Sequence, residues 1–454
     1  MNLSPLFICI CSLLLAPGES RAQQDKPTTR KLDDLLSARF PAAAPGCEVL
    51  VARKGAIIYD KTFGSANLEL DLPLKPGMAF SLASITKQFT AVAILQLVGQ
   101  GKLSLTDSIR KFVPDFPSKG HTITIENLLT HTSGIGDYMQ MSFGGINMER
   151  WDFGPGQLID SFKSRPLEFE PGTRFSYSNS GYYLLGYIIE KISGLRYQRY
   201  IEDNLLKPLG MNHTGFDSAG IIIPNRVSGY RRDGDQYKNA DYWSPTILYS
   251  AGGLISTAPD LFKWHQGLYA GQLLKRETLQ KAFAPYVLKD GGSAGYGYGW
   301  YLRNQNGVRS IEHQGGLPGF QTWETYYPEQ DVFIVILCNS GAAPVDELAV
   351  KISGIVLNIS LQADIHVDDA ILDRYLGTYE MSGAPGRKIT ILRMAGRVVA
   401  KFSEQEYVPL VFQTQTRFQF KNLLNADCEF VLENGKVTRF IVNQNGRYEW
   451  LRLD

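Results

Sequence analysis

A serine and a lysine three residues apart carry the strongest chemical signal in the sequence. Ser84 and Lys87 open an apolar stretch, and residues three apart share one face of a helix, so hydroxyl and amine can meet. A serine hydroxyl becomes a good nucleophile when a neighbouring base takes its proton. A helix start also offers backbone N–H groups and a positive dipole end to a developing oxyanion. The pair predicts a nucleophile with its base, but a helix-capping serine beside a solvated lysine has the same pattern.

The surroundings of Ser84 distinguish this pair from a chance match. Ser108 and Lys111 have the same spacing, but they lie in a polar stretch. The segment after Lys87 is apolar on every side of the expected helix, with Phe89, Val92, Ile94, Leu95, Leu97 and Val98. A helix that is apolar all round is buried. We therefore expect Ser84 to be held rigidly where a buried helix begins, and Ser108 to take no part in chemistry.

Two later motifs add polar groups that such a nucleophile would need. Tyr177-Ser178-Asn179 comes after a Pro-Gly turn and directly before a second apolar helix, expected over residues 181–192. His313-Gln314-Gly315-Gly316 leaves a short expected strand, residues 309–312, and leads into another. We expect the first motif on a loop at a helix start and the second at the end of a strand.

The order and flanks of these three motifs resemble those of the serine β-lactamase and penicillin-binding-protein superfamily. In that family a Ser-x-x-Lys, a Tyr-x-Asn and a Lys-or-His-x-Gly motif meet in one cleft. The resemblance covers about residues 39–359 and is closest to the branch with class C β-lactamases, D,D-carboxypeptidases, D-aminopeptidases and related esterases. Isolated copies of the second and third motifs, Tyr237-Lys238-Asn239 and His265-Gln266-Gly267, lie outside the ordered set.

The resemblance implies a role for each residue of the first two motifs. Ser84 attacks a carbonyl carbon and becomes acylated, while Lys87 and Tyr177 share the acceptance of its proton. A tyrosine is a useful base only if a nearby cation lowers its pKa, and Lys87 is the expected cation. Which of the two is the base stays open, because coupled groups titrate as a pair. Asn179 is expected to hydrogen-bond Lys87 and the substrate amide.

The third motif is expected to bind substrate. The backbone N–H groups of Ser84 and Gly316 would form an oxyanion hole, and Gly315 and Gly316 would let substrate approach the strand closely. His313 occupies the position where β-lactamases usually have lysine. Unlike lysine, a histidine would lose its positive charge around neutral pH. This favours the peptidase, aminopeptidase or esterase branches. A second base at His131 is the weaker interpretation, since the resemblance implies that His131 caps a turn.

Composition and charge limit the partners. The 454 residues have a formal net charge of +1 with acidic and basic residues interspersed, which argues against a nucleic-acid partner. Residues 1–22 have the pattern of a secretory signal, with an uncleaved anchor as the alternative. No His, Cys and carboxylate cluster has metal-ligand spacing, and we expect no cofactor. We therefore expect a secreted or periplasmic protein that acts on a small molecule or a peptide.

The expected fold is α/β (α+β) in two parts. The first part is a three-layer, β-lactamase-like domain, residues 30–360. Its sheet should be mostly antiparallel and closed by both ends of the domain, with early strands over Cys47–Arg53 and Ala56–Phe63 and late strands over residues 321–327 and 332–338. The intervening residues are mainly helical. After a linker, residues 361–371, short strands broken by Asn-Gly turns predict a small antiparallel β-barrel over residues 372–454.

Three cysteines remain outside the signal segment: Cys47, Cys338 and Cys428. An odd number excludes a full disulfide framework. Cys47 and Cys338 both fall on expected strands and could pair, although buried reduced thiols are the simpler interpretation.

Together these features predict an exported serine hydrolase that works through an acyl-enzyme on peptide-like amides or esters, such as a cell-wall peptide or a β-lactam. The alternative is a penicillin-binding or sensor module that is acylated without efficient turnover, because deacylation depends on one positioned water that the sequence does not reveal.

Overall fold

The computed structural model describes residues 26–141, 148–218, 220–305, 308–359, 367–394, 397–403, 406–420, 427–443 and 446–453. The expected signal segment, residues 1–22, lies outside this part, as do residues 361–366 of the expected linker. Those two expectations, and the domain boundaries that depend on them, stay predictions.

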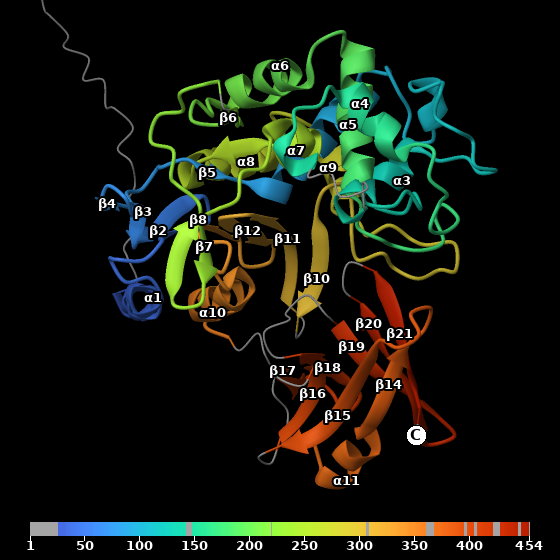
Figure 1. Cartoon of the computed structure of the whole chain (residues 1–454). Helices are drawn as coiled ribbons and strands as arrows, with labels where there is room; N and C mark the ends of the chain where they lie inside the picture. The colour runs from blue at the N-terminus through green and yellow to red at the C-terminus, as the bar shows by residue number, and fades with distance from the viewer. Residues whose placement is uncertain are drawn as a thin grey trace, which may run out of the picture.

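A six-stranded antiparallel sheet forms the centre of the first domain (Figure 1). Its order is β10-β11-β12-β13-β1-β2, with β10 (Tyr301–Gln305), β11 (Val308–Leu317), β12 (Phe320–Tyr327), β13 (Val332–Cys338), β1 (Cys47–Arg53) and β2 (Ala56–Phe63). The first strand of the chain therefore pairs with the last strand of the domain, as predicted. Strand β11 is longer than expected, and His313 lies within it rather than after its end.

The central strand β13 shows why the sheet is covered on both faces. Every residue of β13 is buried. Val332, Ile334 and Ile336 pack in one core with α1 (Lys26–Arg39) and α10 (Val345–Leu357). The alternate residues of β13, Phe333, Val335 and Leu337, belong to the larger core on the opposite face. Because strand side chains alternate between faces, a continuous apolar run is what a three-layer arrangement requires.

The helical region packs on that opposite face (Figure 1). Its helices are α2 (Thr86–Gly99), α3 (Ile125–Leu129), α4 (Pro155–Phe162), α5 (Asn179–Ser193), α6 (Tyr197–Ile201), α7 (Pro245–Gly252), α8 (Ala258–Tyr269) and α9 (Arg276–Ala282). Short strands connect them: β3 (Ser65–Asn67) with β4 (Leu72–Pro73), β7 (Tyr230–Asp233) with β8 (Gln236–Asn239), and a small sheet of β5 (Phe80–Ser81), β9 (Leu254–Ser256) and β6 (Gly215–Phe216).

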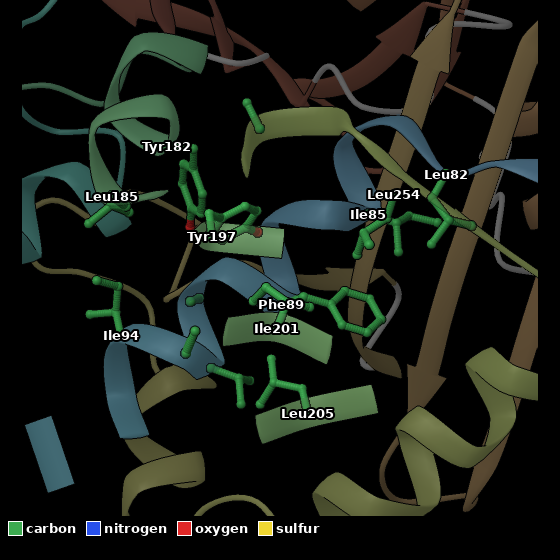
Figure 2. Close-up of a cluster of buried hydrophobic side chains, with 14 of the residues drawn as sticks. Leu82, Ile85, Phe89, Ile94, Tyr182, Leu185, Tyr197, Ile201, Leu205 and Leu254 are labelled. Atoms are coloured by element: carbon green, nitrogen blue, oxygen red, sulfur yellow. The ribbon is translucent and has the colours of Figure 1, made fainter. Parts of the chain in front are cut away.

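Helix α2 is deeply buried along most of its length. Eleven of its 14 residues are buried. Figure 2 shows Phe89 and Ile94 of α2 among side chains from α5, α6 and β9, including Tyr182, Tyr197 and Leu254. A helix that is enclosed in this way gives a fixed platform to the residues at its start.

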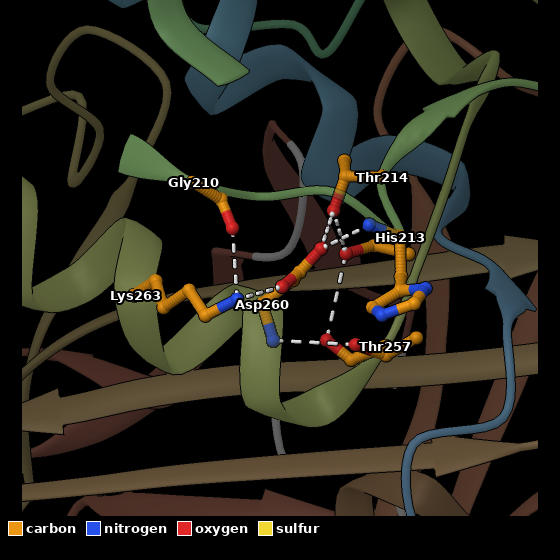
Figure 3. A network of polar contacts seen from close by, with 7 residues as sticks. Gly210, His213, Thr214, Thr257, Asp260 and Lys263 are labelled. Atoms are coloured by element: carbon orange, nitrogen blue, oxygen red, sulfur yellow. Dashed lines mark hydrogen bonds and ion pairs between the residues drawn. The ribbon is translucent and has the colours of Figure 1, made fainter. Parts of the chain in front are cut away.

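A buried carboxylate fastens α8 beside β6 and β9 (Figure 3). Asp260 Oδ2 accepts hydrogen bonds from the His213 backbone at 2.8 Å and the Thr214 hydroxyl at 3.0 Å. Asp260 Oδ1 pairs with Lys263 Nζ at 2.8 Å, and the Thr257 hydroxyl caps the start of α8. These bonds fix the small sheet next to α2.

The C-terminal part is a closed eight-stranded barrel, as predicted. After the short helix α11 (Asp369–Leu372), its strands are β14 (Gly377–Met381), β15 (Lys388–Met394), β16 (Arg397–Ser403), β17 (Glu406–Phe412), β18 (Arg417–Phe420), β19 (Asp427–Glu433), β20 (Lys436–Asn443) and β21 (Arg447–Arg452). Aromatic rings fill it, with Tyr375, Phe430, Phe440 and Trp450 among them. The barrel meets the first domain at a backbone bridge between Gly446 and Ser176.

Candidate active site

Ser84 lies in a single 3₁₀ turn, Ala83–Ile85, immediately before α2. It is partly exposed, whereas the residues on both sides of it are buried. Ala83 has a φ of +51°, a left-handed conformation that is uncommon for a residue with a side chain. Two bonds hold the residue before it: the Leu82 N–H donates to the Leu254 carbonyl at 2.8 Å, and the Thr322 hydroxyl donates to the Leu82 carbonyl at 2.9 Å. The turn is strained and firmly anchored, as is common at functional sites.

Lys87 is fully buried and its amine has three neighbours. Nζ lies 3.0 Å from Ser84 Oγ, 2.8 Å from Asn179 Oδ1 and 2.7 Å from the Ala251 carbonyl oxygen. Burial lowers the pKa of Lys87 to about 7, against an opposing effect of Asp137. A neutral amine has two N–H donors and one lone pair, and two of the three neighbours can only accept. The geometry therefore directs the lone pair at the Ser84 hydroxyl.

The acceptor at Ala251 is a backbone group that no side-chain motif reveals. Ala251 lies in the last turn of α7, where carbonyl groups lack partners within the helix. Helix α7 bends at Tyr249, whose φ of 38° and ψ of −126° are not helical. Gly186 of α5 allows α7 to come close, since a Cβ at Gly186 would stand 2.2 Å from Ser250 Oγ.

Asp137 is a further residue of the site that sequence reasoning did not identify. Its Oδ2 accepts from Asn179 Nδ2 at 2.9 Å, which turns the Asn179 oxygen toward Lys87. Its Oδ1 accepts from the Met139 backbone at 3.1 Å, so the carboxylate also caps a short helix. Burial raises the pKa of Asp137, and hydrogen bonds from Met139 and Asn179 oppose this. Asp137 lies outside the three motifs, and no sequence pattern around it indicates this role.

Tyr177 lies over the Lys87 amine. The centre of its ring is 4.8 Å from Nζ. Burial raises the pKa of Tyr177 well above its usual value, while a hydrogen bond with Ser84 acts in the opposite direction. The expectation that Lys87 would lower the pKa of this phenol is therefore wrong. The reason is desolvation, which disfavours the phenolate and also lowers the pKa of Lys87, so that the amine is less often charged near neutral pH.

His131 holds the loop that carries Tyr177 in place through two hydrogen bonds. Its backbone carbonyl accepts from Ser176 N at 2.9 Å, and its Nδ1 accepts from Ser178 N at 3.0 Å. The imidazole ring lies 4.2 Å, centre to centre, from the Tyr177 ring. Burial lowers the pKa of His131 well below its usual value, so the ring is neutral. His131 thus holds both neighbours of Tyr177, and its backbone has a φ of 57°.

His313 is buried, with 1% of its surface exposed. Its Nδ1 lies 2.6 Å from the Gln314 carbonyl oxygen, which can only accept, and its Nε2 lies 2.9 Å from the Tyr296 hydroxyl. Burial, followed by the charge of Lys87, lowers the pKa of His313 to about 3. The sequence predicts that this imidazole loses its positive charge around neutral pH. With the lowered pKa it is already neutral in mildly acidic solution. Its ring is 6.2 Å, centre to centre, from that of Tyr177.

The two glycines of β11 differ in their surroundings. A Cβ at Gly315 would stand 2.2 Å from the Leu82 carbonyl and 2.3 Å from Thr322 Oγ1. A Cβ at Gly316 would meet nothing closer than the Gln321 side chain at 3.4 Å. Gly315 therefore lets β11 touch the turn that carries Ser84, and Gly316 faces more open space.

The isolated motif copies lie elsewhere. Ser108 caps a 3₁₀ turn through the Arg110 backbone. His265 is buried on α8, with its ring stacked on Phe333. Residues 237–239 lie on the exposed strand β8.

Four aromatic residues of the sequence, Tyr138, Trp243, Tyr249 and Trp300, could line a substrate groove. Of these, Tyr138, Tyr249 and Trp300 are core residues. Trp243 lines a cavity of about 430 Å³. Gly252, which also lines this cavity, lies against Ala83 of the Ser84 turn.

Within the described ranges, no group of three or more His, Cys, Asp and Glu side chains could hold a metal ion. No helix among the same residues has the length and apolar character needed to cross a membrane.

Comparison with known proteins gives a consistent result. The Beta-lactamase family model matches residues 32–353. Penicillin-binding protein 4* of Bacillus subtilis is 31% identical over 428 residues, covering 88% of this chain and 93% of that protein. A putative penicillin-binding protein, PbpX, of the same organism is 32% identical over 64% of this chain and 69% of its own length.

Solved structures agree on the fold. The octameric penicillin-binding protein homologue from Pyrococcus abyssi has a TM-score of 0.65 and 25% identity, covering 94% of this chain and all of that chain. The D-amino acid amidase from Ochrobactrum anthropi SV3 has a TM-score of 0.63 and 22% identity, covering 73% of this chain and 98% of that chain. The second similarity concerns the fold alone.

Proposed function

The chain belongs to the serine β-lactamase and penicillin-binding-protein superfamily and is a serine hydrolase, and from this premise we propose that it hydrolyses peptide-like amides or esters through an acyl-enzyme on Ser84. One observation carries the assignment. The Lys87 amine is buried, its two other partners are acceptors, and its remaining direction faces Ser84 Oγ at 3.0 Å. This arrangement supports removal of the serine proton by a neutral lysine.

The proposed reaction has two halves. In the first, the Ser84 proton moves to Lys87 as Oγ attacks the substrate carbonyl, and the backbone N–H groups of Ser84 and Gly316 stabilise the oxyanion. Tyr177 stays a neutral phenol and passes the proton from Lys87 to the leaving group. In the second half, water attacks the acyl-serine and gives its proton to the same base. The base returns this proton to Ser84 Oγ as the acid product is released.

Other residues keep these groups in place. Asn179 holds the Lys87 amine and, with a substrate bound, faces the substrate amide. Asp137 sets the orientation of the Asn179 amide group. His313 and Gly315 form the wall of β11 beside the reacting carbonyl. These roles act through position, which is worth several orders of magnitude in rate when the reacting atoms are held within contact distance.

The names of structural neighbours support amides as substrates. The neighbours include a D-amino acid amidase and a D-stereospecific amidohydrolase from Streptomyces. The segment of residues 1–22 supports export to the periplasm or the outside of the cell.

The relatives named penicillin-binding proteins favour a second candidate function. In that case Ser84 is acylated, and the acyl-enzyme persists. Intact-mass spectrometry separates the two: the protein is mixed with a β-lactam and with a simple aryl ester, and the adduct mass is followed over time. Rapid loss of both adducts supports the hydrolase, and a stable β-lactam adduct supports the binding module. Unchanged turnover in Ser84→Ala would contradict both.

A further inference from the structure

We propose that the cleft accepts substrates with an uncharged leaving group, an ester or an amide without a free carboxylate, and discriminates against peptides that end in a carboxylate. This inference rests on the function proposed above and names the substrate class of the same site. Its basis is that four basic side chains, Lys87, His313, Arg303 and Arg226, already have partners within the protein.

His313 has no N–H group to offer to a substrate. Its Nδ1 is 2.6 Å from the Gln314 carbonyl, and its Nε2 is 2.9 Å from the Tyr296 hydroxyl. Only 1% of its surface is exposed, so neither nitrogen reaches solvent. Even in a protonated ring, both N–H groups would donate to these two partners, and neither would be left for a substrate. The position at which β-lactamases usually have a lysine therefore supplies no charge to the cleft.

Two arginine side chains, Arg303 and Arg226, are already held in ion pairs. The charge of Arg303 contributes to the lowered pKa of His313, and Arg303 forms an ion pair with Glu312 at 2.6 Å. Arg226 lines the cavity beside Leu317 and pairs with Asp217 at 2.8 Å.

The Lys87 amine already has three hydrogen-bond partners. Asp137 lies on the side of Asn179 opposite Lys87 and adds a carboxylate to the site.

A substrate carboxylate placed beside His313 and Gly315 of β11 would lose its hydration and would gain no cationic partner. An ionised group that is desolvated without a partner is strongly disfavoured, whereas an amide or ester of the same shape loses far less hydration. The surroundings of Ser84 therefore favour a neutral leaving group.

Two matched substrate pairs test the inference with the full-length protein. The first is N-acetyl-D-alanyl-D-alanine against its C-terminal amide, with release of N-acetyl-D-alanine measured by mass spectrometry for both. The second is a phenyl ester against its meta-carboxyphenyl counterpart. We expect kcat/KM to be about tenfold or more higher for the neutral member of each pair that is turned over. An equal or higher value for the carboxylate member overturns the inference.

Variants at His313 provide a second measurement. His313→Lys adds a flexible cation and should narrow the ratio of neutral to charged substrate several-fold. His313→Gln removes the ring without adding charge and should leave that ratio at the wild-type value; circular dichroism establishes that both variants are folded. A ratio that narrows equally in both variants contradicts the inference.

Failure of the inference and of the proposed function are distinguishable. If neither pair shows turnover that is lost in Ser84→Ala, the proposed function is overturned and the inference falls with it. If Ser84-dependent turnover favours the carboxylate substrates, the proposed function stands and only the inference is overturned.

Discussion

The Lys87 amine lies 3.0 Å from the Ser84 hydroxyl, and the other two neighbours of that amine can only accept hydrogen bonds. This relationship decides which group removes the proton. Burial holds the pKa of Lys87 near 7 and moves the pKa of Tyr177 in the opposite direction, far from neutrality. Near neutral pH a substantial fraction of Lys87 is in its basic, neutral form, whereas Tyr177 is a protonated phenol, so we infer that the base is Lys87.

The first prediction concerns the pH dependence of activity. A lysine with a pKa of about 7 is protonated below that pH and neutral above it. We therefore expect kcat/KM for a neutral ester to rise between pH 6 and pH 8 and to level off above. Lys87→Met should lower kcat/KM by about 10²–10⁴ and remove this rise. Lys102→Met, at an exposed position, is the control. A profile that rises only near pH 10 would assign the base to a phenol.

The second prediction concerns His131 as a positioning residue. Its Nδ1 and its carbonyl hold the backbone on both sides of Tyr177. His131→Phe keeps a ring but leaves the Ser178 N–H buried without an acceptor, at a cost of about 1–3 kcal/mol. We expect kcat to fall about tenfold or more, with KM within about threefold of the wild-type value. His131→Asn, which tolerates the positive φ and retains an acceptor, should recover part of kcat.

A purely structural role would give a different pattern for His131. In that case the melting temperature of His131→Phe would fall while kcat per folded molecule stayed at the wild-type value. Thermal unfolding and active-site titration of the same samples separate the two outcomes.

The sequence predicted the strands more closely than the chemistry. Cys47–Arg53, Ala56–Phe63 and 332–338 match the observed strands because apolar patterning and a Lys-Gly turn are local signals. The motifs of Ser84 and Tyr177 lie together as expected.

Three features of the site had no usable sequence signal. The Ala251 carbonyl is a backbone group, Asp137 acts through Asn179, and the burial that sets the pKa of Tyr177 and His313 arises only when distant elements pack together.

The third prediction uses the two adjacent glycines of β11 as a matched pair. Gly315→Ala would place a methyl group 2.2 Å from the Leu82 carbonyl, so β11 must move away from the Ser84 turn. We expect a loss of about 1–3 kcal/mol in the free energy of unfolding together with a large loss of kcat. Gly316→Ala, whose nearest contact is a flexible side chain at 3.4 Å, should keep the wild-type melting temperature. Equal destabilisation of both variants would contradict the close approach at Gly315.

The fourth prediction concerns the cysteines. Cys47 and Cys338 are directly opposite each other on β1 and β13, and both are buried thiols without a disulfide. Burial raises the pKa of Cys47 well above its usual value, which suppresses the reactive thiolate. We expect iodoacetamide to leave Cys47 and Cys338 unmodified in the folded protein and to label both after unfolding, as measured by peptide mass spectrometry. A peptide pair linked through these two residues before reduction would contradict the structure.

The fifth prediction concerns stability and Glu324, which faces His313 across β11 and β12. Burial raises the pKa of Glu324 to about 8, with a hydrogen bond from Gln88 opposing this. The folded protein therefore keeps a proton that the unfolded chain, with a pKa of about 4.5, has already released. Since the folded state keeps this proton between these two values, the contribution of Glu324 to the free energy of unfolding falls as the pH rises from about 4.5 to about 8.

Glu324→Gln removes this dependence, because a neutral amide replaces the protonated acid at every pH. We expect the variant and the wild type to melt at similar temperatures near pH 5. The variant should become progressively more stable than the wild type up to pH 9, by an amount on the order of a few kcal/mol. Glu329→Gln, at an exposed position on the same hairpin, should show no such trend. A difference between Glu324→Gln and wild type that stays constant from pH 5 to pH 9 would mean that Glu324 is ionised in the folded protein.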